Sequence, residues 1–302
     1  MVLRFSAMAS RLGPVATRLR LITDRRPFRA VALAVAGALL LTTAIVALTG
    51  GPELHAKGTP AARAAKVPGP EVAAELILDE AGLVGEFSFV LYDAVEDRYL
   101  LSYRPDQVQF SQSTAKLLIA VGALQRGADP SRVAEMLTWS DDPIANELWG
   151  LVEGPVLTEE LAATMGLEHT TPSPEWGRWG DTMIAASDMV RIYEYLLDEL
   201  PEGDRTVILD ALAATTAKGS DGFDQTFGLP TAAAGLDWAV KQGWGCCKPD
   251  RFLVSTGAIG ADRRYIATIF GAWDETQVGE AQAAEEMTTV AAAVIDRIPG
   301  EG

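Results

Sequence analysis

The stretch Ser113-Thr114-Ala115-Lys116 is the part of the chain best suited to chemistry. On a helix, residues three apart share one face, so the Ser113 hydroxyl and the Lys116 amine can meet. At a helix N-terminus the backbone N–H groups favour an oxyanion, and a desolvated lysine is neutral enough to accept a proton. The pattern predicts a serine nucleophile with a lysine base. A serine cap followed by an exposed lysine gives the same four letters.

Two further motifs follow in a characteristic order. Ser140-Asp141-Asp142 comes first, and Lys241-Gln242-Gly243 lies later inside the strand-like segment 238–244. The order S-x-x-K, S-D-N, K-T-G is the signature set of class A β-lactamases and penicillin-binding proteins. The chain resembles that superfamily over residues 70–298. As a structural alternative, Ser140-Asp141-Asp142 caps a helix that starts at Pro143, and this reading is compatible with catalysis.

The resemblance implies a role for each matching residue. Ser113 is acylated, Lys116 activates it, Ser140 relays a proton to the leaving group, and Lys241 maintains the electrostatic balance. The backbone N–H groups of Ser113 and Trp244 are expected to form the oxyanion hole. No cofactor and no metal is implied. The residues expected to contact substrate are Asp142, Glu175, Gln242, Gly243 and Trp244.

Three departures from the superfamily pattern predict weak turnover of β-lactams. Gln242 replaces a hydroxyl that binds the substrate carboxylate, and no arginine lies in segment 252–258 to share that anion. Asp142 replaces an asparagine, and it is expected to raise the pKa of Lys116 unless Lys241 lies between them. Segment 170–180 offers only Glu175 to activate a deacylating water, and no asparagine accompanies it.

The elements that must position these residues form two groups. A helix is expected over 70–81, and segments 86–93 and 98–103 alternate as in a β-hairpin. Residues 113–212 are mostly helical in period, strands return from 236, and a helix closes the chain. This order predicts an α+β fold: an antiparallel sheet formed by both ends of the domain, with flanking helices and an all-helical lobe over about 111–231. The cleft is expected where sheet and lobe meet.

The first 69 residues are expected to lie outside this domain. Residues 1–29 are basic and expected to be cytoplasmic, and 30–48 form an uncharged run long enough to cross a bilayer. Residues 49–69 are a flexible linker. The run is a signal anchor or a cleaved signal peptide, so the domain is either held at the cell membrane by a single pass or secreted. No cysteine follows the run, which excludes lipoprotein processing.

Composition narrows the classes of partner. The formal net charge is −16, although residues 1–50 carry seven arginines and one acid. Such an acidic domain argues against nucleic acid as a partner, and leaves membrane contact to the N-terminal segment. The two histidines, His55 and His169, come without a G-x-S-x-G motif, so a Ser/His/Asp hydrolase is not expected. Adjacent Cys246 and Cys247 form either a vicinal disulfide or two free thiols.

The sequence as a whole predicts an extracytoplasmic serine acyl hydrolase that works through a Ser113 acyl-enzyme. Its expected substrate is a small-molecule, peptide or envelope-derived acyl compound. The alternative is a catalytically inert envelope binding protein on the same fold, with turnover lost through Gln242 and Asp142.

Overall fold

The computed structural model describes residues 69–247 and 249–300. The predicted cytoplasmic segment 1–29, membrane segment 30–48 and almost all of linker 49–69 lie outside the described residues. None of the helices in the described part combines the length and apolar composition needed to span a bilayer.

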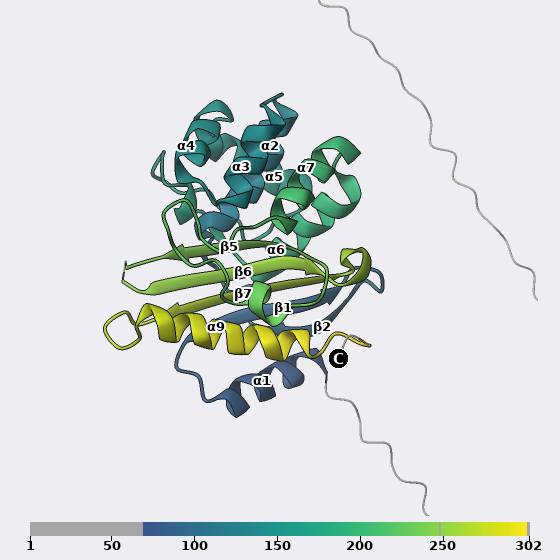
Figure 1. Ribbon diagram of the computed structural model, residues 1–302, viewed down its shortest axis with the longest axis vertical. Coiled ribbons are helices and arrows are strands. Elements are labelled where there is room, and N and C mark those ends of the chain that lie inside the picture. The colour runs from purple at the N-terminus through teal and green to yellow at the C-terminus, as the bar shows by residue number, and fades with distance from the viewer. Residues whose placement is uncertain (1–68, 248, 301–302) are drawn as a thin grey trace, which may run out of the picture. The chain divides into compact units, whose positions relative to one another are not determined.

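One five-stranded antiparallel sheet joins the two ends of the domain (Figure 1). Its order is β2-β1-β7-β6-β5, so the N-terminal hairpin pairs with a C-terminal strand through β1 and β7. This topology confirms the predicted α+β fold. The strands are β1 (Glu86–Asp93), β2 (Arg98–Tyr103), β5 (Trp238–Gly245), β6 (Arg251–Ile259) and β7 (Tyr265–Trp273).

Helices cover both faces of the sheet. On one face lie α1 (Pro70–Ala81), α8 (Leu229–Ala232) and α9 (Glu280–Ile295), and α9 runs across β6 and β7 (Figure 1). The other face carries α6 (Ala186–Glu194) and the helical lobe, which adjoins edge strand β5 through α7. The lobe helices are α2 (Lys116–Gln125), α3 (Pro130–Thr138), α4 (Asp142–Leu151), α5 (Gly154–Met165) and α7 (Glu202–Ala213).

Alternation along the strands divides the apolar side chains between two cores. Val90 and Ala239 pack on the face that meets the lobe, whereas their neighbours Phe89 and Val240 pack against the α1, α8 and α9 side. Successive residues of a strand point to opposite faces, so Lys241 belongs to the lobe face and Gln242 to the other. Lys241 can therefore reach the cleft between sheet and lobe, whereas the Gln242 side chain cannot.

Two short segments position Ser113 and Ser140. Ser113 lies in a 3-10 helix, Gln112–Ala115, that leads directly into α2. Asp141 caps α4 by accepting a hydrogen bond from the Ile144 N–H at 2.8 Å, which leaves the Ser140 hydroxyl uncommitted to capping. Gln112 and Ser140 both have left-handed backbones, with φ of 49° and 52°, which non-glycine residues rarely adopt.

Candidate active site

Four polar side chains meet at the junction of α2, α4 and β5. Lys116 Nζ lies 2.8 Å from Ser113 Oγ and 3.4 Å from Ser140 Oγ. Lys241 Nζ donates to Ser140 Oγ at 2.9 Å and to its neighbour's carbonyl, Gln242 O, at 2.8 Å. Side chains three apart eclipse in a 3-10 turn, which is why Ser113 and Lys116 touch. The structure thus brings all four predicted catalytic residues into one hydrogen-bonded chain.

Both amines are buried, and burial governs their protonation. Lys116 is 0% exposed and Lys241 is 1% exposed. Burial lowers the pKa of Lys116, while the nearby Asp142 carboxylate raises it and offsets part of that effect. Burial lowers the pKa of Lys241 well below its ordinary value, and the charge of Lys116 lowers it further. Acylation requires the lysine beside the Ser113 hydroxyl to accept a proton, and burial favours the neutral form that can do so.

Asp142 contacts the candidate base directly. Its Oδ1 lies 2.6 Å from Lys116 Nζ, so Lys241 does not separate the two groups. The Asp142 side chain is 59% exposed, and water screens its field. Burial therefore outweighs the carboxylate, and the net direction of the Lys116 pKa is downward.

A pocket of about 260 Å³ opens over Ser113 between the lobe and β5. Trp179 forms one wall, with its ring centroid 4.3 Å from Lys116 Nζ. The indole Nε1 donates to Asn146 Oδ1 at 2.8 Å, which ties the wall to α4. The catalytic motifs do not include Asn146, and sequence reasoning missed it as a lining residue.

In the loop before β4 (Met183–Ile184), the carboxylate that lines the pocket is held in an ion pair and is not free to activate a water. Arg178 Nε and Nη2 donate to Asp181 at 2.5 and 3.0 Å, and both residues line the pocket. Glu175 is 76% exposed, faces Arg178 at 4.0 Å, and does not line the pocket. The structure therefore does not bring Glu175 to Ser113.

Gln242 is held on the far face of the sheet. It is 0% exposed, its Nε2 donates to Phe227 O, and its Oε1 accepts from Ser255 Oγ at 2.9 Å. The prediction that Gln242 contacts substrate is therefore wrong. Strand alternation places its side chain on the face of the sheet opposite to that of Lys241. The side chain instead anchors the segment before α8.

Gly243 and Trp244 lie beside Ser113. A Cβ on Gly243 would come within 3.1 Å of Ser113 N, so glycine permits the close approach of β5 to the 3-10 turn. Trp244 lines the pocket, stacks on Phe223 at 4.8 Å, and donates from Nε1 to Asp221 Oδ2 at 2.9 Å. The predicted oxyanion role of the Trp244 backbone N–H stays a prediction.

Comparison with solved structures identifies the architecture. PenP of Rhodopseudomonas palustris, described as a class A β-lactamase, superposes with a TM-score of 0.63 over 76% of this chain and 100% of its own, at 19% identity. An ancestral class A β-lactamase gives a TM-score of 0.61 over 75% and 100%, at 18% identity. The chain has the class A β-lactamase fold. This confirms the resemblance inferred from the motifs.

Curated relatives come from mycobacteria. The protein with this β-lactamase fold is 38% identical over 207 residues to a protein named as lipoprotein LppW, in Mycobacterium tuberculosis and in Mycobacterium bovis. The match covers 63% of this chain and 65% of those relatives' length. No protein-family model matches the chain.

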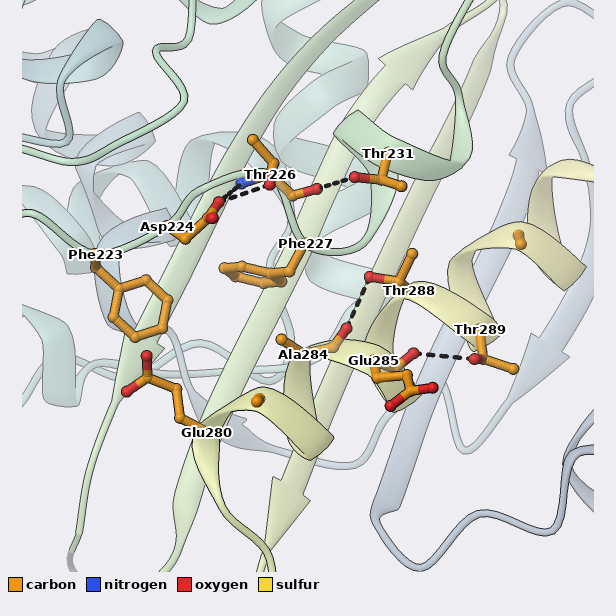
Figure 2. Close-up of a pocket in the computed structure, with 12 residues that line it drawn as sticks. Phe223, Asp224, Thr226, Phe227, Thr231, Glu280, Ala284, Glu285, Thr288 and Thr289 are labelled. Atoms are coloured by element: carbon orange, nitrogen blue, oxygen red, sulfur yellow. Dashed lines mark hydrogen bonds between the residues drawn. The ribbon is translucent and has the colours of Figure 1, made fainter.

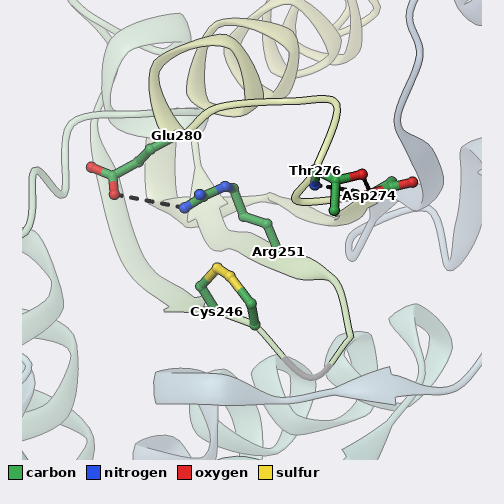
Figure 3. Close-up of a disulfide and its surroundings, with 6 residues drawn as sticks. Cys246, Arg251, Asp274, Thr276 and Glu280 are labelled. Atoms are coloured by element: carbon green, nitrogen blue, oxygen red, sulfur yellow. Dashed lines mark hydrogen bonds and ion pairs between the residues drawn. A yellow bond between two sulfur atoms is a disulfide. The ribbon is translucent and has the colours of Figure 1, made fainter.

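The turn after β5 carries a disulfide between Cys246 and Cys247 (Figure 3). This pairing corresponds to one of the two alternatives left open by the sequence. The bridge lies close to the Arg251–Glu280 ion pair of 3.7 Å at the start of β6. Cys246 also lines a cavity of about 320 Å³ that shares Gln112, Arg178 and Asp181 with the pocket over Ser113.

A larger apolar cavity of about 620 Å³ lies between the segment before α8 and helix α9 (Figure 2). Its threonines are occupied within the protein: Thr231 donates to Thr226 O, and Thr288 donates to Ala284 O. Phe223 and Phe227 form its apolar wall at the end near β5. With no paired nucleophile and base among its lining residues, this cavity does not compete with the Ser113 pocket as the site of chemistry.

Proposed function

We propose that this protein is an extracytoplasmic serine hydrolase that transfers an acyl group to Ser113. The observation that carries the proposal is the chain of contacts from Ser113 Oγ through Lys116 Nζ and Ser140 Oγ to Lys241 Nζ. Neutral Lys116 takes the Ser113 proton as Oγ attacks the acyl carbonyl. The proton then passes through Ser140 to the leaving group, while Lys241 fixes the Ser140 hydroxyl.

The pocket provides more of the groups needed for acylation of Ser113 than for hydrolysis of the acyl-enzyme. Acylation has a buried base next to the nucleophile, whereas the carboxylates lining the pocket are Asp142, bound to Lys116, and Asp181, bound to Arg178. Release of the acyl group needs a water and a base on the face now occupied by Trp179. We therefore expect an acyl-enzyme that forms faster than it is hydrolysed.

Envelope location forms part of the proposal. The mycobacterial relatives are named as lipoproteins, and the first fifty residues of this chain combine basic residues with an apolar run. The substrate class is an acyl compound of the envelope or a small molecule that reaches it.

The second candidate is an envelope binding protein without turnover. It is favoured by the direct Lys116–Asp142 contact, which stabilises the charged lysine. The two candidates separate in one assay, hydrolysis of a p-nitrophenyl ester by the full-length protein. A hydrolase loses about 10²-fold or more with Ser113→Ala, while the matched Ser187→Ala variant keeps its rate. Equal rates for Ser113→Ala and the unmodified protein would contradict the hydrolase.

A further inference from the structure

A second cavity adjoins the pocket over Ser113. It has a volume of about 320 Å³ and shares Gln112, Arg178 and Asp181 with that pocket. Its other walls come from β3 (Gln109–Phe110), from the turn after β5 and from the start of β6. Gln112 directly precedes Ser113 in the chain. The two cavities therefore meet beside the residue that carries the acyl group in the proposed function.

Two phenyl rings form an apolar wall of this second cavity. Phe110 and Phe252 pack edge to face, with their ring centroids 5.3 Å apart. Both side chains are only partly buried, and neither belongs to either of the two hydrophobic cores of the domain. Aromatic side chains bury a large apolar area when a ligand covers them. The pair therefore offers a surface for the apolar part of a small molecule.

The rest of the lining is mainly polar, and Gln112 has a special place in it. A Cβ on Gly245 would collide with the Gln112 amide, so this amide lies directly over the backbone of β5. Gln112 is partly exposed and lines both cavities. Its amide can donate a hydrogen bond to a hydroxyl or accept one from it. A lining that combines phenyl rings with an amide matches an alcohol that has an apolar body.

The fate of an acyl group on Ser113 depends on which nucleophile is positioned beside it. The carboxylates that line the pocket, Asp142 and Asp181, are held in ion pairs, so neither is free to activate a water. An alcohol held in the second cavity is positioned by its own binding, and positioning converts a bimolecular attack into an effectively unimolecular one. Neutral Lys116 can take the proton of that alcohol as it takes the proton of Ser113 during acylation.

We propose that this protein is an acyltransferase that passes the acyl group of Ser113 to an alcohol bound in the second cavity. The alcohol oxygen attacks the acyl carbon, and its proton passes to Lys116 Nζ. The bond between the acyl carbon and Ser113 Oγ then breaks, and Ser113 Oγ recovers a proton from Lys116. The products are a new ester and the free enzyme. This inference rests on the proposed acyl-enzyme and adds the acceptor.

The experiment offers two acceptors at once to the full-length protein. The acyl donor is p-nitrophenyl acetate, and the acceptors are 2-phenylethanol and ethanol at equal concentration. Mass spectrometry measures the two acetate esters, and p-nitrophenol release measures acylation. The ratio of 2-phenylethyl to ethyl ester should be about tenfold or more, the scale expected when one phenyl ring is partly buried. Ser113→Ala, the blank, should form neither ester.

Variants of the aromatic wall test where the acceptor binds. Phe252→Ala removes one of the two rings, so the ester ratio should fall by about tenfold. The ratio is informative because a general loss of activity lowers both esters equally. The matched Leu151→Ala, at an exposed apolar residue on α4 that lines neither cavity, should keep the ratio. Phe252→Leu serves where the alanine variant does not fold, and it should also lower the ratio, because it removes the ring but keeps an apolar side chain.

Two kinds of failure are distinguishable. Absence of Ser113-dependent p-nitrophenol release would contradict the acyl-enzyme itself, and the acceptor site with it. Ser113-dependent release with an ester ratio near one would overturn the acceptor site and leave the acyl-enzyme intact. A high ratio that is unchanged in both Phe252 variants would likewise show that the alcohol does not bind in the second cavity.

Discussion

On the side of the cleft formed by α2, α4 and β5, two hydroxyls and two amines form one continuous chain of contacts from Ser113 to Lys241. On the side formed by residues 175–181, the Trp179 ring lies against Lys116, and Arg178 and Asp181 form an ion pair in the pocket lining. The first side has what is needed to form an acyl-enzyme. The side formed by residues 175–181 has no carboxylate that lines the pocket free of an ion pair and could activate a water to hydrolyse the acyl-enzyme. Under the proposed function, acylation of Ser113 has a base beside it, whereas hydrolysis of the acyl-enzyme does not.

The largest effect expected from this comparison belongs to Lys116. Lys116→Ala removes the buried base next to Ser113 Oγ, and ester hydrolysis should fall by about 10²-fold or more. The control is Lys218→Ala, an exposed lysine outside the contact chain, which should keep its rate. Initial rates with a p-nitrophenyl ester measure both variants. An undiminished hydrolysis rate in Lys116→Ala would show that Lys116 is not the base.

The second prediction concerns the loop side. With penicillin, the protein should form an acyl-enzyme slowly and release it more slowly still, with kcat well below the ordinary enzyme range of ~10 s⁻¹. Glu175→Gln should leave the release rate within about twofold, because the Glu175 carboxylate is exposed and faces Arg178. Stopped-flow and steady-state hydrolysis provide the measurement. Turnover at ~10 s⁻¹ or above, lost in Glu175→Gln, would show that the loop side is competent.

The third prediction uses the direction of the Lys116 pKa. The base acts when neutral, so the acylation rate should rise as pH increases through the pKa of Lys116 and should level off above it. Asp142 raises that pKa, and burial lowers it more. Removing the carboxylate in Asp142→Asn should therefore move the rise to lower pH. A pH–rate profile of ester acylation tests this, and a shift to higher pH would contradict the assignment.

The smallest catalytic effect is expected on the far face of β5. Gln242→Met leaves Phe227 O and Ser255 Oγ without their partner, so the free energy of unfolding should fall by about 1–3 kcal/mol. Ester hydrolysis should stay within about threefold, since the side chain does not line the pocket. Urea denaturation and initial rates measure the two effects, with exposed Gln125→Met as the control. A large loss of hydrolysis rate with an unchanged free energy of unfolding would indicate that Gln242 contacts the substrate in the cleft.

Much of the fold could be predicted from local sequence patterns. The predicted helix over 70–81 and hairpin over 86–103 are α1 and β1–β2, because capping, alternation and turn residues act over short distances. The i, i+3 spacing of Ser113 and Lys116 likewise fixes their contact. Strand alternation separates Gln242 from Lys241, whereas the motif alone predicts that both side chains face the cleft.

Contacts between distant segments that no motif records could not be predicted from the sequence. Trp179 reaches Lys116 across 63 positions only because the loop before β4 folds onto α4, where Asn146 holds the indole. Arg205 and Arg263 meet around one cavity although α7 and the β6–β7 turn are far apart along the chain. Such neighbours depend on tertiary packing, which period and spacing do not encode.

The most direct measurement of the central claim is the intact mass of the full-length protein after exposure to a fluorophosphonate, followed by peptide mapping. We expect a single adduct on the peptide that contains Ser113, with labelling slowed by about 10²-fold or more in Lys116→Ala. Ser113→Ala should take up no label. An adduct at another residue, or equal labelling of Ser113→Ala and the unmodified protein, would contradict the claim that Ser113 is the nucleophile.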